Sequence, residues 1–240
     1  MTAVSFTTNS LINRQRAPTK QELLAIPWLA LLSKSDYDYV LPEIKVTMAE
    51  EGDVICRIGR PVTYWFGVIE GLLKMSSDSK DGKTMTFVGV PTGGWFGEGT
   101  VLKREPYRYN ISALRDSTVA GISIEAFHWL LDHSIAFNKY LMRQLNERLS
   151  QFIAAREVDR ISNPEHRVAR TLAGLLNPTL YPQIGNTLTI TQQELAYLVG
   201  LSRQRVNVAL KALEAQGTIR LEYGGLTVPD INKLNQQFSL

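Results

Sequence analysis

Residues 187–219 read TLTITQQELAYLVGLSRQRVNVALKALEAQGTI, and this stretch decides the fold of the C-terminal part of the chain. Thr191, followed three residues later by Glu194, forms a capping box, in which a hydroxyl and a carboxylate each satisfy a free backbone N–H at the start of a helix. Gly200 predicts the end of that helix, and Ser202 predicts the start of another. The pattern indicates two short helices joined by a tight turn.

The second helix of this pair has two unlike faces. Apolar residues recur from Val206 at i, i+3, i+4 and i+7, which predicts a buried face. The other face carries arginine, glutamine and asparagine, whose paired hydrogen-bonding groups match guanine and adenine edges in the major groove. The alternative is that this polar face is only solvated, as many are. We expect DNA contacts from Thr191, Gln192, Ser202, Arg203, Gln204, Arg205, Asn207 and Lys211.

Two short β-runs follow the helix pair, at residues 218–223 and 226–228. They flank Gly224-Gly225, a dipeptide typical of hairpin turns. Two helices followed by a hairpin are the elements of a winged helix-turn-helix. Because glycine has no side chain, the tip of such a wing can approach a phosphate backbone closely.

Composition limits the other classes of function. The chain has 240 residues, 44% of them hydrophobic, which suits one or two domains with real cores. Its net charge of only +3 means that DNA binding would depend on a local basic patch. The single cysteine, Cys56, argues against a disulfide framework, a structural zinc site and an iron–sulfur cluster, so we expect no metal. We expect a cytoplasmic protein with no membrane partner, because no apolar run approaches the ~20 residues of a membrane helix and the N-terminus lacks a signal-peptide core.

The N-terminal half changes from helical to strand-like patterns. Residues 1–18 are polar and are expected to form a loose arm or a strap over a neighbouring subunit. Thr19 and Glu22 form a second capping box, and Pro27 is expected to break the helix of residues 19–32 into two pieces. Short alternating runs with Gly-rich turns then extend from residue 41 to about 123, which indicates a β-sandwich or barrel. We place this β-domain at residues 19–133.

A long helix follows a short one at residues 125–132. The pattern predicts it over residues 134–162, before Asn163-Pro164, with the C-terminal domain at residues 164–240. So long a helix needs something to bury its apolar stripe, and a seam between two chains is the economical solution. The alternative is packing onto its own β-domain. We expect the dimer contacts to be Leu141, Leu145, Leu149 and Phe152.

Three short stretches of the β-domain carry a family resemblance when they are taken together with the long helix and the wing. They are FGVIEG at residues 66–71, GWFGEG at 94–99 and YRYNISA at 107–113. In this order and spacing they resemble the CRP/FNR family of bacterial transcription regulators. The resemblance implies an α+β fold with a double-stranded β-roll, a dimerisation helix at residues 134–163 and a winged helix-turn-helix. It also implies a homodimer that binds a pseudo-palindromic operator in double-stranded DNA and works with RNA polymerase.

Family members that bind cyclic AMP hold its phosphate with exposed backbone N–H groups and an arginine. Gly97, Glu98 and Arg108 match that cassette, whereas Tyr109 and Asn110 stand where small residues are expected. On the long helix, an apolar pair replaces two further polar contacts. The resemblance therefore implies a small anionic effector, with a cyclic nucleotide as one option and cyclic AMP disfavoured. A pairing of Arg108 with Glu98 that holds an empty pocket closed is the alternative. The candidate effector residues are Gly97, Glu98, Gly99, Arg108, Tyr109, Phe152 and Ile153.

Other readings remain open at this point. Haem sensing would need an axial ligand, for which only His128 and His133 are placed near the long helix. A second class of function is a small-molecule-binding regulatory module whose C-terminal helix pair is a protein interface. That class favours exposed leucine or phenylalanine where this sequence has Arg203 and its polar neighbours. An enzyme is not expected: no catalytic set recurs at useful spacing, and Asp36 and Asp38 are expected in a polar turn.

Overall fold

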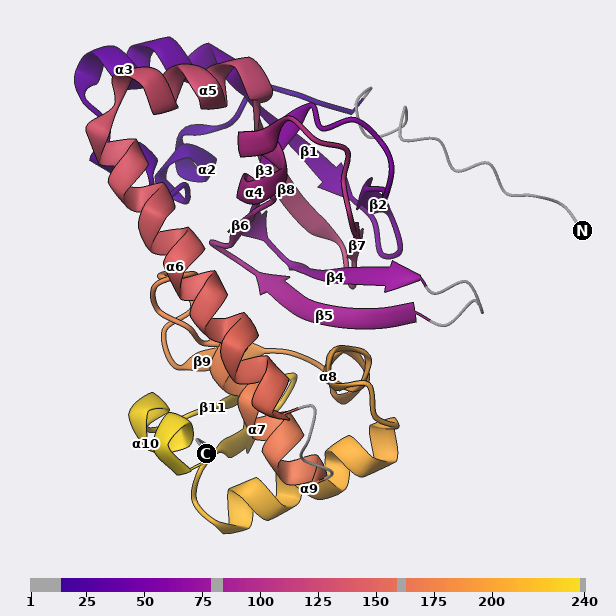
Figure 1. The fold of residues 1–240 in the computed structure, drawn as a ribbon. Helices are drawn as coiled ribbons and strands as arrows, with labels where there is room; N and C mark the ends of the chain where they lie inside the picture. Colours follow the sequence, from indigo (N-terminus) through magenta and orange to yellow (C-terminus); the bar gives the residue numbers. More distant parts are fainter. Residues whose placement is uncertain (1–13, 79–83, 159–162, 238–240) are drawn as a thin grey trace, which may run out of the picture. The chain divides into compact units, whose positions relative to one another are not determined.

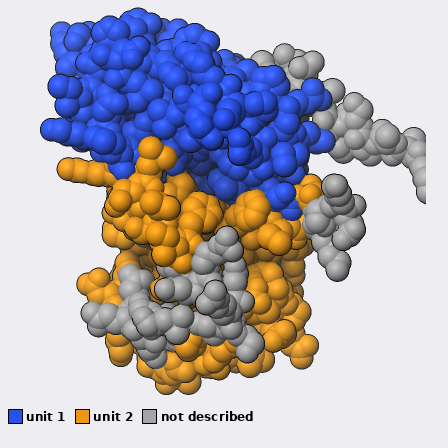
Figure 2. Space-filling model, in the orientation of Figure 1, with its two compact units in different colours: residues 1–77, 90–142 blue, residues 78–89, 143–240 orange. Residues whose placement is uncertain are grey.

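The computed structural model describes residues 14–78, 84–158 and 163–237 of the chain. They fall into two compact units, one made of residues 1–77 and 90–142 and the other of residues 78–89 and 143–240 (Figure 2). Antiparallel sheets dominate the N-terminal part and helices the C-terminal part (Figure 1). The expected α+β fold, with a β-roll, a long helix and a winged helix-turn-helix, is confirmed.

Two four-stranded antiparallel sheets make the β-roll. One has the order β1-β8-β3-β6, and in it β1 pairs with β8 from Ile44 opposite Ile122 to Ala49 opposite Ser117. The other has the order β2-β7-β4-β5. The strands are β1 (Ile44–Ala49), β2 (Val54–Cys56), β3 (Tyr64–Glu70), β4 (Leu72–Asp78), β5 (Thr84–Pro91), β6 (Trp95–Phe96), β7 (Asn110–Ala113) and β8 (Ser117–Ser123). The predicted hairpin tip at 78–83 lies outside the described residues, except for Asp78.

The described end of the N-terminal arm is bound to its own chain. Arg16 and Val46 of β1 exchange two backbone hydrogen bonds of 2.9 and 2.8 Å, and the guanidinium of Arg16 donates to Glu22 at 2.8 Å. Glu22 also completes the capping box with Thr19 at the start of α2 (Lys20–Leu24). A separate 3-10 turn, η1 (Leu29–Leu31), follows, so the predicted break into two pieces is confirmed. Residues 1–13 of the predicted arm lie outside the described residues.

The expectation of a polar turn around Asp36 and Asp38 is wrong. These residues lie in α3 (Lys34–Val40), which continues into the 3-10 turn η2 (Leu41–Glu43). The hydroxyl of Ser33 accepts the backbone N–H of Asp36 at 3.2 Å, and a carboxylate in the first turn favours the positive end of the helix dipole. Tyr39 then stacks on Trp129 of α5 (Ile124–His133), with ring centroids 3.8 Å apart. Tertiary contact therefore stabilises a helix with too few apolar residues to show a period.

Five aromatic rings form the centre of the first unit. Trp28, Trp65, Trp95, Phe127 and Phe137 are each 0–1% exposed. The ring centroids of Trp65 and Trp95 lie 4.4 Å apart, and Phe137 lies 5.6 Å from both Trp28 and Trp65. The cluster joins strands β3 and β6, helix α5 and the first turns of α6 (Ile135–Val158). The start of the long helix is thus fixed by aromatic packing. The last residues of the predicted helix, 159–162, lie outside the described residues.

The C-terminal helices and a small sheet fold together in the second unit. Helix α7 (Pro164–Leu175) is capped by the side chain of Asn163, which accepts the backbone N–H of Glu165 at 2.8 Å. A three-stranded sheet has the order β10-β11-β9, and its strand β9 is an element that the sequence patterns did not predict. The remaining elements are α8 (Gln192–Val199), α9 (Arg203–Ala215), β9 (Thr187–Thr189), β10 (Arg220–Glu222), β11 (Gly225–Thr227) and α10 (Ile231–Gln237).

One prediction concerns the packing of β3 on β6. A Cβ atom on Gly67 would overlap the indole ring of Trp95, whereas a Cβ on Gly99 of helix α4 (Glu98–Lys103) would meet nothing within 4 Å. Gly67→Ala should lower the free energy of unfolding by about 1–3 kcal/mol, because overpacking displaces the ring. Gly99→Ala is the matched control and should be neutral or slightly stabilising. Urea unfolding of both variants measures this, and equal stabilities would contradict it.

Candidate functional site

Local capping builds the helix-turn-helix as its sequence predicts. The hydroxyl of Thr191 accepts the N–H of Glu194 at 3.1 Å, and the carboxylate of Glu194 accepts the N–H of Thr191 at 2.7 Å. Gly200 ends α8 in the left-handed conformation with φ of 69°. Ser202 then caps α9 by accepting the N–H of Arg205 at 3.3 Å. The direction of α9 is therefore set by residues at its own start.

Helix α9 buries one face and exposes the other. Val206, Ala209, Leu210 and Leu213 are at most 3% exposed. The side chains of Arg203, Gln204, Arg205 and Lys211 are exposed, as the sequence predicted. Asn207 is half-buried and its side-chain oxygen accepts from Gln192 of α8 at 3.2 Å. Five of the predicted contact residues thus lie on or beside the outward face of α9, and Gln192 is joined to that face by its hydrogen bond to Asn207.

Two further features belong to this surface, and the second was missed by the sequence reasoning. Val208, which the sequence places four residues after Gln204 at a position that cannot donate a hydrogen bond, is 63% exposed. Tyr223 is fully exposed at the tip of the wing, because the two-residue turn between β10 and β11 is Tyr223-Gly224 rather than Gly224-Gly225. Gly225 lies in β11, where a Cβ would overlap the carbonyl oxygen of Leu188 in β9. Gly224, with φ of 76°, is the glycine that the turn requires.

The cassette residues come together at the start of helix α4. Gly97 is the residue before the helix, with φ of 89°, and Glu98 is 2% exposed in its first turn. A Cβ on Gly97 would lie 3.5 Å from the hydroxyl oxygen of Tyr109, whereas Gly99 has no such neighbour. The ring of Tyr109 thus reaches over the backbone at which the resemblance implies a phosphate.

Arg108 is exposed and paired outside the cassette. Its side chain is 73% exposed, and its guanidinium pairs with Glu105, three residues earlier, at 2.8 Å. The pairing with Glu98 that we considered is not the one found. Lys103 also contacts Glu105 at 3.0 Å, and these two cations hold the pKa of that exposed carboxylate below its usual value. An arginine held by a surface carboxylate is poorly placed to bind a buried anion.

Cys56 and the two histidines near α5 have other roles than ligation. Burial raises the pKa of the Cys56 thiol to about 12, so it stays protonated at neutral pH. A ring nitrogen of His128 lies 3.0 Å from the carbonyl oxygen of Val101, and one of His133 lies 2.8 Å from that of Trp129. Within the described residues, no group of three or more potential metal ligands lies together. These contacts give no support to haem ligation.

The outward side of α6 differs from the predicted stripe. Phe137 and Leu141 are 0% and 3% exposed, because they pack inside the first unit. Leu149 is 59% exposed, and Phe152 and Ile153 are 45% and 59% exposed. Leu145 is half-buried, and Met142 is 61% exposed. The exposed apolar row is therefore Met142, Leu145, Leu149 and Phe152, spaced 3-4-3 as in a two-chain seam.

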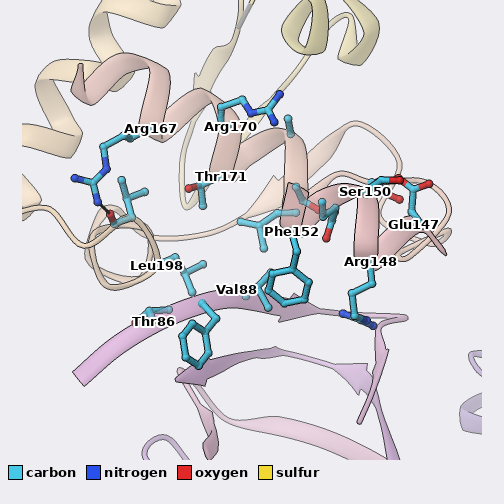
Figure 3. Close-up of a pocket in the computed structure, with 18 of the residues that line it drawn as sticks. Thr86, Val88, Glu147, Arg148, Ser150, Phe152, Arg167, Arg170, Thr171 and Leu198 are labelled. Atoms are coloured by element: carbon cyan, nitrogen blue, oxygen red, sulfur yellow. Dashed lines mark hydrogen bonds between the residues drawn. The ribbon is translucent and has the colours of Figure 1, made fainter. Parts of the chain in front are cut away.

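A cavity of about 370 Å³ lies in the second unit (Figure 3). Strand β5 supplies residues 86–89, and α6, α7 and the end of α8 supply most of the remaining wall. Phe152, an expected effector residue, lines this cavity, whereas Ile153 and the cassette residues do not. Three arginines border it, namely Arg148, Arg167 and Arg170. Among the described residues, no helix is long and apolar enough to cross a membrane.

Comparison with known proteins agrees with this architecture. The family model of the cyclic nucleotide-binding domain matches residues 47–134, and that of the Crp-like helix-turn-helix domain matches residues 166–237. The chain is 28% identical over 167 residues to the cAMP-activated global transcriptional regulator CRP of Haemophilus influenzae, covering 67% of this chain and 73% of that protein. It is 27% identical over 205 residues to the transcriptional regulator SdrP of Thermus thermophilus, covering 82% and 96%.

Solved structures share the fold. A variant of CooA from Carboxydothermus hydrogenoformans matches with a TM-score of 0.64 at 20% identity, covering 89% of this chain and 95% of that one. FixK2 from Bradyrhizobium japonicum matches with a TM-score of 0.62 at 15% identity, covering 80% and 96%. With both domain models matched in this order, the chain belongs to the CRP/FNR family and is a CRP-like transcriptional regulator.

Proposed function

We propose that the protein is a homodimeric regulator that binds a pseudo-palindromic operator and acts with RNA polymerase in the cytoplasm. The observation that carries this proposal is the outward face of α9, on which Arg203 and Gln204 are exposed at the first turn while the opposite face is buried. A protein interface would favour exposed leucine or phenylalanine there. Two such helices related by a two-fold axis should lie roughly 34 Å apart, one turn of B-DNA.

The exposed row of α6 supports the homodimer. Met142 takes the place of Leu141 in the proposed seam, because Leu141 is already buried in its own chain. Met142 and Leu149 are seven residues apart, Leu145 lies between them, and Phe152 follows three residues after Leu149. Ile153 lies next to this row and is also exposed. Left in water, so continuous an apolar row would be costly on a soluble helix.

The first test of the dimer uses Met142→Lys combined with Leu149→Lys. Two charges in an apolar seam should yield monomers, because each would be buried without a partner. The matched control is Leu24→Lys on α2, which is 85% exposed and lies outside the seam. Sedimentation velocity measures the mass: wild type and control should be dimers. A double variant that still sediments as a dimer would show that the seam lies elsewhere.

The residues of α9 give the operator its expected sequence. Arg203 suits a bidentate contact to guanine, and the amide of Gln204 suits adenine. Val208 cannot donate a hydrogen bond, but its exposed methyl groups suit the C5-methyl group of thymine. The fully exposed Tyr223 and the basic Arg220 suit the wing for contact with the sugar–phosphate backbone. The half-site should thus keep one G·C pair, under Arg203, and differ from that of the family members that bind cyclic AMP at the positions read by Gln204 and Val208.

Selection from a random oligonucleotide pool tests this reading. Arg203→Ala should weaken binding by about 1–3 kcal/mol and relax preference at one base pair. Val208→Ala should relax preference at a T·A pair, and replacing that thymine by uracil should affect wild type more than the variant. Arg205→Ala, which removes a charge beside the face, should mainly reduce the salt dependence. Full specificity in Arg203→Ala would contradict the assignment of the recognition face.

The cassette supports a regulator that does not respond to cyclic AMP. Tyr109 covers the backbone at Gly97, and Arg108 is held by Glu105. Millimolar cyclic AMP should therefore leave both the melting temperature and the affinity for the selected operator unchanged, since a ligand stabilises only the state that binds it. The matched variant Arg108→Ala should behave like wild type in this assay. A micromolar response that Arg108→Ala abolishes would overturn the proposal.

A further inference from the structure

We propose that the cavity of the second unit is the effector site, and that it takes a small organic anion with an apolar body, such as an aryl or alkyl carboxylate. Its regulatory meaning rests on the proposed function as a DNA-binding regulator. The cavity, of about 370 Å³, is large enough for such a molecule. The inference draws on its charges, its apolar walls and the elements that meet there.

The charges of the cavity favour an anion. Among the described residues, three arginines border it against a single carboxylate, that of Glu147. Glu147 already accepts a hydrogen bond from Asn177 at 2.6 Å, and Arg167 donates to the carbonyl oxygen of Val199 at 2.7 Å. Arg170 is half-buried on α7 and forms no ion pair or hydrogen bond with the other described residues. A half-buried guanidinium with no partner among the described residues provides paired donors for a carboxylate or sulfonate.

The remaining walls are apolar. Phe152 of α6 and Val88 of β5 border the cavity together, as the close-up in Figure 3 shows, and Phe87 and Leu198 extend the apolar surface. Phe87, which is outside the proposed dimer seam, is 44% exposed, so a bound apolar group would remove its surface from water. A ligand with only charge would leave Phe87 exposed, and a ligand with no charge would leave Arg170 desolvated. The walls therefore select an amphipathic anion.

The elements around the cavity connect it to the DNA-binding helices. A Cβ on Gly89 of β5 would lie 2.8 Å from Leu175 of α7 and 2.9 Å from Leu198 of α8. Tyr181 also donates its hydroxyl to the carbonyl oxygen of Gly89 at 3.3 Å. A ligand here would contact β5, α6, α7 and α8 at once. Because α8 supports α9, such contacts can bias the position of the recognition helix.

The probe for the test is 8-anilino-1-naphthalenesulfonate, an aryl anion whose fluorescence rises in apolar sites, titrated into the full chain. Wild type should bind one molecule per chain. Arg170→Gln should weaken binding about tenfold through loss of the charged donor, and Arg170→Lys should restore much of it. The neutral analogue N-phenyl-1-naphthylamine should be insensitive to Arg170→Gln. Arg108→Gln, in the cassette, is the matched control and should bind like wild type.

The outcomes separate the alternatives. Weaker binding in Arg108→Gln but not in Arg170→Gln would place the probe in the cassette. Equal binding by all variants would reveal an adventitious surface site. Either result overturns the proposal, and so does the absence of binding. Equal melting temperatures exclude unfolding as the cause of a loss. Fluorescence anisotropy of the selected operator gives the second readout: the probe should change DNA affinity in wild type and not in Arg170→Gln. A chain that binds no DNA would refute the proposed function and leave the titration interpretable.

Discussion

The packing of Phe137 against Trp28, Trp65 and Phe127 is the interaction on which the long helix depends. It buries one side of the first turns of α6 completely, and Leu141, one turn further, follows it into the same core. Once that side is fixed, the geometry of the helix turns a neighbouring row of residues outward. That row is apolar at Met142 and Leu149, so aromatic packing within the chain decides which apolar residues are exposed for the proposed dimer.

The cassette keeps the backbone that the family resemblance implies for a phosphate site, while its arginine is paired elsewhere. Gly97 keeps the left-handed conformation that starts helix α4, and Glu98 stays buried beside it. The hydroxyl oxygen of Tyr109 would lie 3.5 Å from a Cβ on Gly97, and Arg108 pairs at the surface with Glu105. Under the proposed function, a cyclic nucleotide would have to displace the tyrosine ring and draw Arg108 from this ion pair, although a surface pair of this kind contributes little to stability.

Local chemistry made most of the DNA-binding half predictable from the sequence. The capping box at Thr191 and the glycine at 200 act through neighbours in the chain, so their patterns report the structure directly. What escaped prediction depends on distant partners. Helix α3 is stabilised by the stacking of Tyr39 on Trp129. Position 225 requires glycine because a Cβ there would overlap the backbone of β9. The apolar residues of α6 belong to two faces of the helix. Leu141 and Met142 are alike in the sequence pattern, and only the structure shows that the first is buried and the second exposed.

The cavity could not be read from the sequence for the same reason, since β5 and the helices that line it are far apart in the chain. Its position has a physical advantage for a regulator. A ligand beside Leu198 would contact α8, the helix that leads into the turn before α9. Differential contact is what allows a ligand to shift a conformational equilibrium, and the shift cannot exceed the difference in affinity between the two states. If Arg170 contributes a tenfold preference for the conformation that positions α9 on DNA, the operator affinity can change by no more than that factor for each chain, and by its square for a two-fold dimer with both cavities filled.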